Sequence, residues 1–288
     1  MAFKKILCVL CGGDGDVAAL ETAFAVAKPQ DGHVAGLFVR NDPREAVPMM
    51  GEGVSGSLVE QIVEIADRDS AERAGGARQR FEGVRTRFGA APAAAAPGPG
   101  GLSASWTEAV GNIEEVPVRA ARLADLTVFP RVGIEQESYA TMMLEAVLMG
   151  SGRPVLIAPA QAPASVGRKV AVCWNGTAES ARAVALAMGV IGIADEVHVL
   201  SADSGKTKGG MAEGLVEALG WHGVRAVAHG VRPDHEPVGA ALLRAAGEAG
   251  CDLMVMGGYG HSRLREMILG GVTRHVLNHA TLPVLMAH

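Results

Sequence analysis

The sequence is poor in aromatic residues and has no excess of positive charge. Aromatic side chains make up 4% of its 288 residues, too few for the stacking platforms on which proteins bind single-stranded nucleic acid. The 26 basic and 31 acidic side chains give a formal net charge of −5, so no general basic surface attracts a nucleic acid backbone. We therefore expect no nucleic-acid partner.

Long apolar runs are also missing. No stretch reaches the roughly 18 apolar residues of a membrane span, and the apolar run after Lys4 and Lys5 is too short for a secretory signal. We therefore expect a cytoplasmic protein without membrane contact. Hydrophobic residues nevertheless make up 49% of the chain, enough to fill the cores of two domains of ordinary size.

Cysteine is scarce, but two of the four cysteines, Cys8 and Cys11, form a C-x-x-C pair. Such a pair can serve in redox chemistry or metal binding. These two lie in an extended apolar run, where residues three apart point to opposite faces of a strand. We interpret them as small buried hydrophobic side chains and assign no metal site to the chain.

The chain repeats itself, and the repeat predicts its organisation. "KKILCVLC" (4–11) and "RKVAVCW" (168–174) are each followed by a glycine-containing turn, an Ala-rich helical stretch and another strand. Both halves close on a similar strand, "RPVLIAPA" at 153–160 and "LPVLMAH" at 282–288. We assign a first domain to residues 1–160, a linker to 161–167 and a second domain to 168–288.

Strands that alternate with helices are typical of parallel sheets with crossover helices. We predict an α/β fold of two tandem doubly wound domains, each with a parallel sheet of about five strands and related by a pseudo-twofold axis. The first domain carries an insertion near 45–105. This insertion comprises an extra helical stretch at 57–88 and an exposed flexible loop, "GAAPAAAAPGPGG", at 89–101.

Two groups of glycines stand near the end of the chain. Gly257 and Gly260 follow a predicted strand, and Gly270 and Gly271 precede a predicted helix, "VTRHVLNHA". Ligands of an open parallel sheet bind outside the carboxyl ends of the strands, where the strand order reverses. Backbone N–H groups there attract phosphate when no side chain is in the way. The pattern predicts a phosphate cradle made of two loops; the alternative is a pair of tight turns without a ligand.

The G-x2-G-x9-G spacing, the helix after it and the terminal "PVLM" strand resemble the nucleotide-binding motif of the universal stress protein family. The paired halves resemble its tandem members. The resemblance implies an adenine nucleotide alpha hydrolase-like fold and a site for ATP, with or without Mg²⁺. Carried over position by position, it implies nucleotide contacts from Asn175, Ala202, Met256, Gly257, Gly260, Gly270, Gly271 and Val272.

Two of these positions depart from the family pattern. Asn175 stands where the family usually has an Asp beside the nucleoside, and Gly271 stands where it has a Ser or Thr. The amide of Asn175 can both donate and accept a hydrogen bond, whereas a carboxylate only accepts. Neither change removes a backbone cradle, but together they leave the affinity and the identity of the ligand open.

The first half lacks most of the glycines. The residues aligned with Gly257, Gly260, Gly270 and Gly271 are, in order, Pro130, Gly133, Thr141 and Met142. Proline has no N–H to donate, and the last two bring side chains toward the cradle. We therefore expect the first domain to keep the fold and to lack a nucleotide site, which would mean that the fold alone does not require the glycines.

Three other sequence patterns resemble functional motifs only in part. "SGKTKGG" (204–210) fails as a P-loop because Leu200 stands where a glycine is needed, which leaves Lys206 as an exposed loop residue. His275 and His279 have the spacing of a metal-binding pair on a helix but lack the Glu of a zinc motif. "RPDHEP" (232–237) is interpreted as the N-terminal cap of a helix.

The leading interpretation is a tandem universal-stress-like protein that binds an adenine nucleotide in its second domain and has a regulatory role. No catalytic residue is assigned. Two alternatives stay open: a ligand-free module that dimerises and binds proteins, and a weak ATPase. We expect a homodimer formed through the terminal strands of the two halves, because edge-to-edge pairing would cover their open edges.

Overall fold

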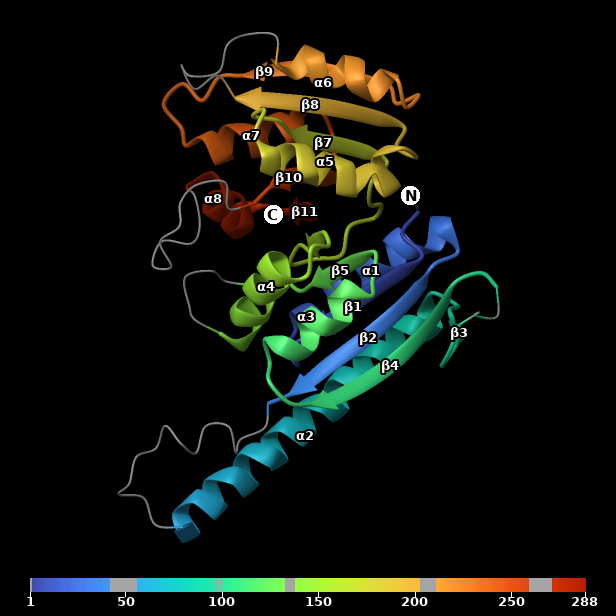
Figure 1. Ribbon diagram of the computed structural model, residues 1–288, viewed down its shortest axis with the longest axis vertical. Coiled ribbons are helices and arrows are strands. Elements are labelled where there is room, and N and C mark those ends of the chain that lie inside the picture. Colours follow the sequence, from blue (N-terminus) through green and yellow to red (C-terminus); the bar gives the residue numbers. More distant parts are fainter. Residues whose placement is uncertain are drawn as a thin grey trace.

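Strands run through the middle of the molecule, and helices cover them on both sides (Figure 1). The computed structural model describes residues 2–41, 56–96, 98, 100–132, 138–202, 211–258 and 271–288. The first half contributes β1 (Lys5–Leu10), α1 (Gly15–Ala27), the 3₁₀ helix η1 (Lys28–Gln30), β2 (His33–Arg40), α2 (Gly56–Arg87), β3 (Ala91–Pro92), β4 (Ser103–Val110), α3 (Glu115–Arg122), β5 (Leu126–Phe129), α4 (Tyr139–Gly150) and β6 (Val155–Ile157). The second half contributes β7 (Lys169–Cys173), α5 (Ala178–Ile191), β8 (Glu196–Ala202), α6 (Met211–Gly220), β9 (Ala226–Val231), α7 (Val238–Glu248), β10 (Leu253–Gly257), α8 (Gly271–His279) and β11 (Val284–Ala287).

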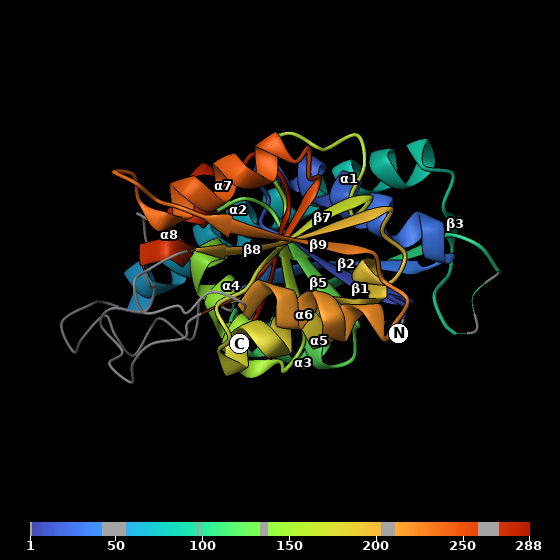
Figure 2. The same cartoon turned by 90° about the horizontal axis from the view of Figure 1, so that it is seen from above.

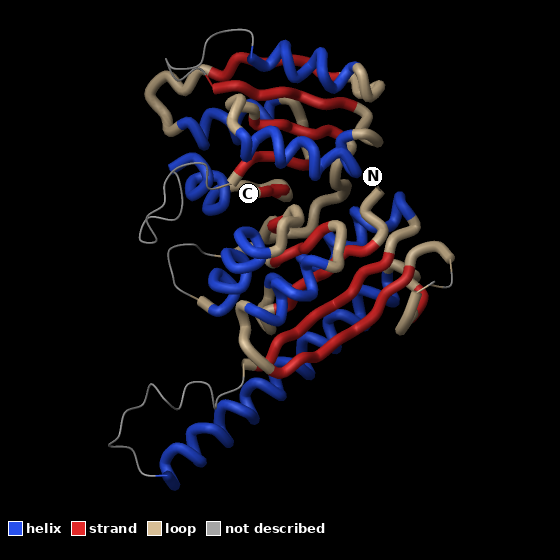
Figure 3. The backbone as a smooth tube through the Cα atoms, viewed as in Figure 1, coloured by secondary structure: helices blue, strands red, loops and turns tan. Residues whose placement is uncertain are grey.

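The strands form one sheet of 11 strands, in the order β3-β4-β2-β1-β5-β6-β11-β10-β7-β8-β9. Figure 3 shows them as one ladder that runs the length of the molecule. Apart from the two-residue β3, each half has the same order of five strands, and all pairs within a half are parallel. The α/β class and the doubly wound topology are confirmed, but the two predicted sheets are one continuous sheet.

The two halves meet where β6 pairs with β11, the only antiparallel pair recorded among the described strands. The register runs from Val155 opposite Met286 to Ile157 opposite Val284, so Leu156 and Leu285 face each other at its centre. Each of these strands also has a parallel neighbour on its other side. The predicted route to a homodimer is therefore wrong, because the terminal strands pair with each other inside one chain and have no open edge.

Each face of the sheet has its own apolar core. Helices α1, α2, α5 and α6 contribute to the first core, and α3, α4, α7 and α8 contribute to the second. Side chains alternate between the cores along each strand. Figure 2 shows the strands fanning about the centre of the molecule as the sheet twists. The twist brings the carboxyl ends of β2 and β8 to the same side of the molecule, the left in Figure 1.

The C-x-x-C pair follows this alternation. Cys8 is buried in the first core, whereas Cys11 packs against the second core on the opposite face. Both thiols are free, and burial raises the pKa of Cys11 to about 12. The interpretation as a buried hydrophobic side chain is confirmed for Cys8, whereas Cys11 is half-buried against the second core.

Helix α2 differs from the predicted insertion. Its C-terminal part packs Ala77 and Phe81 into the first core, in the place that α6 occupies in the second half. Gly36 of β2 makes this packing possible, because a Cβ there would lie 2.7 Å from the Phe81 ring. Only the N-terminal part of α2, where Ile65 is 63% exposed, extends beyond the sheet (Figure 1). None of the described helices is long and apolar enough to cross a membrane.

In each half a carboxylate connects the start of the first strand to the start of its neighbour in the sheet. Asp125 connects β1 with β5, and Asp252 connects β7 with β10. Asp125 accepts hydrogen bonds from the backbone N–H groups of Lys4 and Lys5, both at 2.9 Å. Asp252 accepts the equivalent bonds from Arg168 and Lys169, at 3.2 and 2.9 Å. These matched contacts fix the alignment of the two halves, with Lys4 equivalent to Arg168.

Asp252 also holds the linker. Its carboxylate accepts bonds from Gly167 N at 3.0 Å and from Ser165 Oγ at 2.6 Å, at the end of the predicted linker. Asp252 thus accepts hydrogen bonds from four donors. Asp125 accepts only the two that correspond to Arg168 N and Lys169 N. The start of the second half is therefore held by more hydrogen bonds to this carboxylate than the start of the first half.

We expect this difference to appear in stability. Because hydrogen bonds to charged groups each contribute about 1.5–3 kcal/mol and do not add fully, Asp252→Ala should lower the free energy of unfolding by about 3 kcal/mol and Asp125→Ala by about 2 kcal/mol. Asp195→Ala is the control, because its ion pair with Arg168 is exposed and should contribute under about 1 kcal/mol. Urea unfolding followed by circular dichroism measures all three. Equal losses for Asp252→Ala and Asp195→Ala would contradict the assignment.

Candidate functional site

The predicted site lies at the carboxyl edge of the second half, around β7. This strand has β8 on one side and β10 on the other, and Cys173 stands opposite both Leu200 and Met256. The chain therefore leaves the sheet on the same edge at Asn175, Ala202 and Gly257. This is also where the strand order of the half reverses, the usual ligand position in doubly wound sheets.

Of the other predicted nucleotide contacts, the structure describes Met256, Gly271 and Val272. Met256 contributes its side chain to the second core, where it is 4% exposed, so its backbone is the part nearest the edge. The predicted helix is confirmed as α8, which begins at Gly271 and packs Val272 against the second core. Gly260 and Gly270 lie outside the described residues. Figure 1 places α8 on the side of the molecule to which β8 points.

The turn from β7 to α5 is built around Asn175 and Thr177. Asn175 Oδ1 accepts from Thr177 N at 3.2 Å and from Thr177 Oγ1 at 2.9 Å. Thr177 Oγ1 in turn accepts from Ser180 N and caps α5. Because an N–H must face the oxygen of the amide, this arrangement fixes the orientation of the Asn175 side chain. Its Nδ2 is therefore the donor side of the amide and lies away from Thr177.

Gly257 has a structural reason to be glycine. A Cβ at this position would lie 2.8 Å from Glu179 C and 2.8 Å from Ser180 N, both in the backbone of α5. Real Cβ atoms do not approach backbone so closely, so any side chain here would push the start of α5 away from β10. The expectation that the fold does not require the glycines is therefore wrong for Gly257.

In the first half the glycine at the equivalent contact lies on the helix instead of on the strand. The alignment set by the Asp125 and Asp252 contacts makes Gly15 equivalent to Glu179, and Pro130 equivalent to Gly257. A Cβ on Gly15 would lie 3.1 Å from Pro130 Cβ. Each half thus has one glycine where the fourth strand meets the first helix, but on opposite partners. In the first half it lies on the helix, and in the second half it lies on the strand.

A carboxylate fills the equivalent loop of the first half. Asp16 is fully buried and accepts hydrogen bonds from Cys11 N and Gly12 N, both at 2.9 Å. Burial raises the pKa of Asp16, while these two bonds and the guanidinium of Arg80, 4.0 Å away, act to lower it. The equivalent residue in the second half is Ser180, whose Oγ donates to Thr177 O instead.

Helix α2 adds side chains above the same loop of the first half. A Cβ on Gly12 would meet Arg73 Cβ at 3.2 Å, so the Arg73 side chain already lies against the end of β1. Arg40, at the end of β2, is held by Asp67 of α2 at 3.6 Å and Glu108 of β4 at 3.3 Å. The carboxyl edge of the first half is thus occupied by its own side chains.

The first half also contacts α8 directly. The guanidinium of Arg131, the residue after Pro130, donates to the carbonyl oxygens of Asn278 and Ala280 at the C-terminal end of α8. Cationic side chains stabilise this end of a helix, where carbonyl groups lack partners. The helix that starts at the predicted phosphate position is therefore anchored at its other end by the first half of the chain.

The sequence prediction missed one charged residue at the site, Glu179. It lies in the first turn of α5, and its Cβ would be 3.0 Å from a Cβ on Gly257. A hydrogen bond from its own backbone N–H is the main cause that lowers the pKa of Glu179, so the carboxylate is ionised at neutral pH. A fixed negative charge beside Gly257 opposes a bare phosphate. It could be found in the sequence only after the start of α5 is known.

The structure does not support a chemical role for the other sequence patterns that it describes. The rings of His275 and His279 stack with centroids 4.2 Å apart, and His279 Nδ1 bonds to His275 O. Within the described ranges, no group of three or more His, Cys, Asp or Glu side chains could hold a metal ion. The predicted helix cap at 232–237 is wrong, because α7 is preceded by Pro237 and has no side-chain cap. Lys206 lies outside the described residues.

Comparison with known proteins shows which family the second half of the chain is similar to. The family model described as the universal stress protein family matches residues 167–288. These residues therefore match a universal stress protein domain. A curated universal stress protein of Synechocystis is 26% identical over 151 residues, and the matched part covers 49% of this chain and 49% of that protein.

The solved structures extend the fold to the whole chain. A universal stress protein from Archaeoglobus fulgidus aligns over 99% of this chain and 97% of its own, with 18% identity and a TM-score of 0.69. A protein of unknown function from Pseudomonas aeruginosa aligns over 99% of this chain and 92% of its own, with 17% identity and a TM-score of 0.57. At this identity the likeness shows the fold alone: two universal stress protein folds in tandem.

The packing role of Gly257 gives a direct test. Gly257→Ala should shift the start of α5 and lower the free energy of unfolding by about 1–3 kcal/mol, the usual cost of overpacking. Gly271→Ala is the matched control, because no atom of the described residues lies within 4 Å of its added Cβ, and it should leave stability unchanged or slightly raised. Thermal unfolding of both variants measures this. A Gly257→Ala protein as stable as the unsubstituted chain would contradict the close approach of α5 to β10.

Proposed function

We propose that the second domain of this universal stress protein binds an adenine nucleotide such as ATP, and that the protein has a regulatory role in the stress response. The observation that carries the proposal is the difference between the two halves at the same edge. In the first half a buried carboxylate, Asp16, takes the N–H groups of the β1–α1 loop. In the second half Ser180 stands there, and this is the half that matches the family model.

The chemistry of the second edge suits a nucleoside. Asn175 offers Nδ2 as a donor, so the ligand atom that it meets must accept a hydrogen bond, as a ring nitrogen or a ribose oxygen does. Gly271 stands at the start of α8 and adds no side chain there, and the N-terminus of a helix is a favourable place for a phosphate. The first domain, closed by Asp16, Pro130 and Arg73, would then support α8 through Arg131 rather than bind nucleotide itself.

The phosphate loop is tested by calorimetric titration of ATP. The unsubstituted protein should bind, and Gly260→Val or Gly270→Val should weaken binding about tenfold or more, because each side chain fills the cradle. Gly133→Val, the aligned change in the first domain, is the matched control and should leave the affinity unchanged. Absence of binding at about millimolar ATP, or equal loss in all three variants, would overturn the proposal.

The charge of Glu179 gives a second test, which concerns Mg²⁺. Glu179→Gln removes a carboxylate beside Gly257 and should raise the affinity for metal-free ATP about two- to fivefold, a modest change because the group is exposed and screened. The affinity for Mg²⁺-bound ATP should change less, because the cation offsets the same repulsion. Titrations in EDTA and in Mg²⁺ measure both.

Glu217→Gln is the control for net charge, because this exposed carboxylate lies on α6 away from Gly257. It should leave both affinities unchanged. Identical responses of the Glu179→Gln and Glu217→Gln variants would show that the phosphates bind somewhere other than beside the start of α5.

A further inference from the structure

In each half, a glycine in the loop after the first strand is covered by a side chain from another helix. The two glycines are Gly12, after β1, and Gly176, after β7, and their φ angles are positive, 80° and 73°. They are equivalent in the alignment that pairs Lys4 with Arg168. Gly176 directly follows Asn175, a predicted nucleotide contact, so the side chain that covers it lies beside the candidate site.

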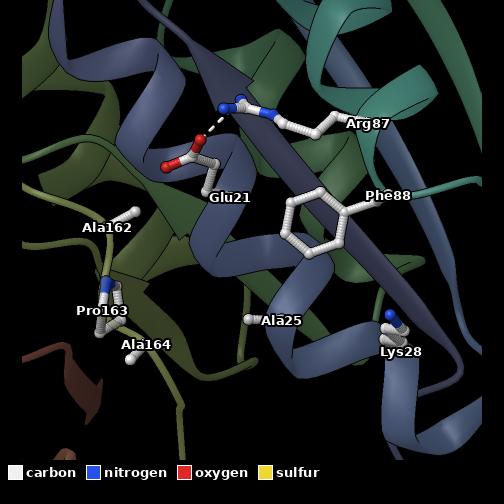
Figure 4. A pocket seen from close by; sticks show the side chains of 8 residues that line it. All are labelled: Glu21, Ala25, Lys28, Arg87, Phe88, Ala162, Pro163 and Ala164. Atoms are coloured by element: carbon white, nitrogen blue, oxygen red, sulfur yellow. Dashed lines mark ion pairs between the residues drawn. The ribbon is translucent and has the colours of Figure 1, made fainter.

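In the first half the covering side chain is charged. A Cβ on Gly12 would lie 3.2 Å from Arg73 Cβ of α2. Further along α2, Arg87 forms an ion pair with Glu21 of α1 at 2.6 Å, as Figure 4 shows, and this contact holds the end of the helix against the fold. Helix α2 thus places a guanidinium side chain over the end of β1.

In the second half the covering side chain is Met211, the first residue of α6. A Cβ on Gly176 would collide with the Cε methyl group of Met211, and apart from the chain neighbours of Gly176 no other described residue lies within 4 Å of it. Met211 is half-buried, and within the described ranges it belongs to neither apolar core. An apolar side chain therefore lies at the carboxyl edge, next to Asn175, without filling the interior.

Met211 lies on the side of the site opposite to the glycine motif. Strand β7 has β10 on one side and β8 on the other. Gly257 ends β10, whereas Met211 begins α6, which packs on β8 and β9. A nucleotide that places its phosphates beside Gly257 and α8 and then passes Asn175 extends its base toward Met211.

Resting on the nucleotide site proposed above, we propose that Met211 contacts the aromatic base of the bound nucleotide and makes the second half select nucleotides over phosphate compounds without a base. A thioether is polarisable and packs favourably against aromatic rings. Its unbranched side chain can follow the ring while it still covers Gly176. Arg73, which covers the equivalent glycine of the first half, offers a positive charge instead of an apolar surface.

The contact is tested by NMR on the full chain made with methionine that carries carbon-13 in its methyl group, with the Met211 signal assigned from Met211→Leu. ATP should move this signal upfield, because a methyl group over the face of an aromatic ring is shielded. Tripolyphosphate, which has no base, should leave it in place. Met149, 49% exposed on α4 of the first half, is the control signal and should not move with either compound.

Calorimetric titration measures the selectivity. Met211→Ala should weaken the binding of ATP about three- to tenfold, the usual range for a contact between sulfur and a ring, and should leave any affinity for tripolyphosphate unchanged. Met211→Leu keeps an apolar side chain of similar volume and should bind ATP within about threefold of the unsubstituted chain.

The same measurements separate this inference from the proposed function. If the unsubstituted chain binds no ATP at about millimolar concentration, the proposed function fails and the role of Met211 fails with it. If ATP binds but the Met211 signal stays in place or moves equally with tripolyphosphate, the nucleotide site stands and the contact is overturned. Equal losses of both ligands in Met211→Ala overturn it as well, because Met211 then only supports the loop.

Discussion

The antiparallel pairing of β6 with β11 is the contact on which the rest of the structure depends. It turns two parallel sheets into one and places Leu156 against Leu285 at the centre of the molecule. It also covers the strand edge that each half would otherwise expose, where unpaired N–H and C=O groups would invite association with other chains. Since the sheet is continuous, both apolar cores extend through both halves.

The two halves share a fold but have diverged at the edge where a ligand would bind. The fourth strand of the repeat and the first helix approach closely in both halves, and the glycine at this contact is Gly15 on the helix in the first half and Gly257 on the strand in the second. This choice affects chemistry, because the partner that is not glycine brings a side chain to the edge. In the first half that side chain is a proline, and in the second half it is the carboxylate of Glu179.

Much of the fold could be predicted from the sequence because the repeat is visible in short apolar runs and in the closing strands. The doubly wound α/β class and the helix that starts near Gly271 follow from this pattern. The pairing partner of β6 could not be predicted, because an apolar strand ending in "PVLI" pairs equally well within a chain or between chains. The place of α2 was also missed, since its charged N-terminal part concealed the buried face formed by Ala77 and Phe81.

The candidate site was predicted as positions along the chain rather than as contacts. Asn175, Ala202 and Gly257 do leave the sheet on one edge, as the motif requires. The orientation of the Asn175 amide and the position of Glu179 depend on how α5 starts, which involves Thr177 and cannot be derived from glycine spacing. The packing role of Gly257 was hidden for the same reason, because the aligned proline made the position look free of constraint.

The pairing of β6 with β11 is a contact within one molecule, so dilution does not break it. Two separate subunits joined by the same strands would come apart as their concentration fell, and each would then have to keep every feature needed to find its partner again. In a single chain the first half is held beside the second half whatever its own loops contain. Its carboxyl edge is therefore free to fill with Asp16, Arg73 and Pro130 while Arg131 still reaches α8.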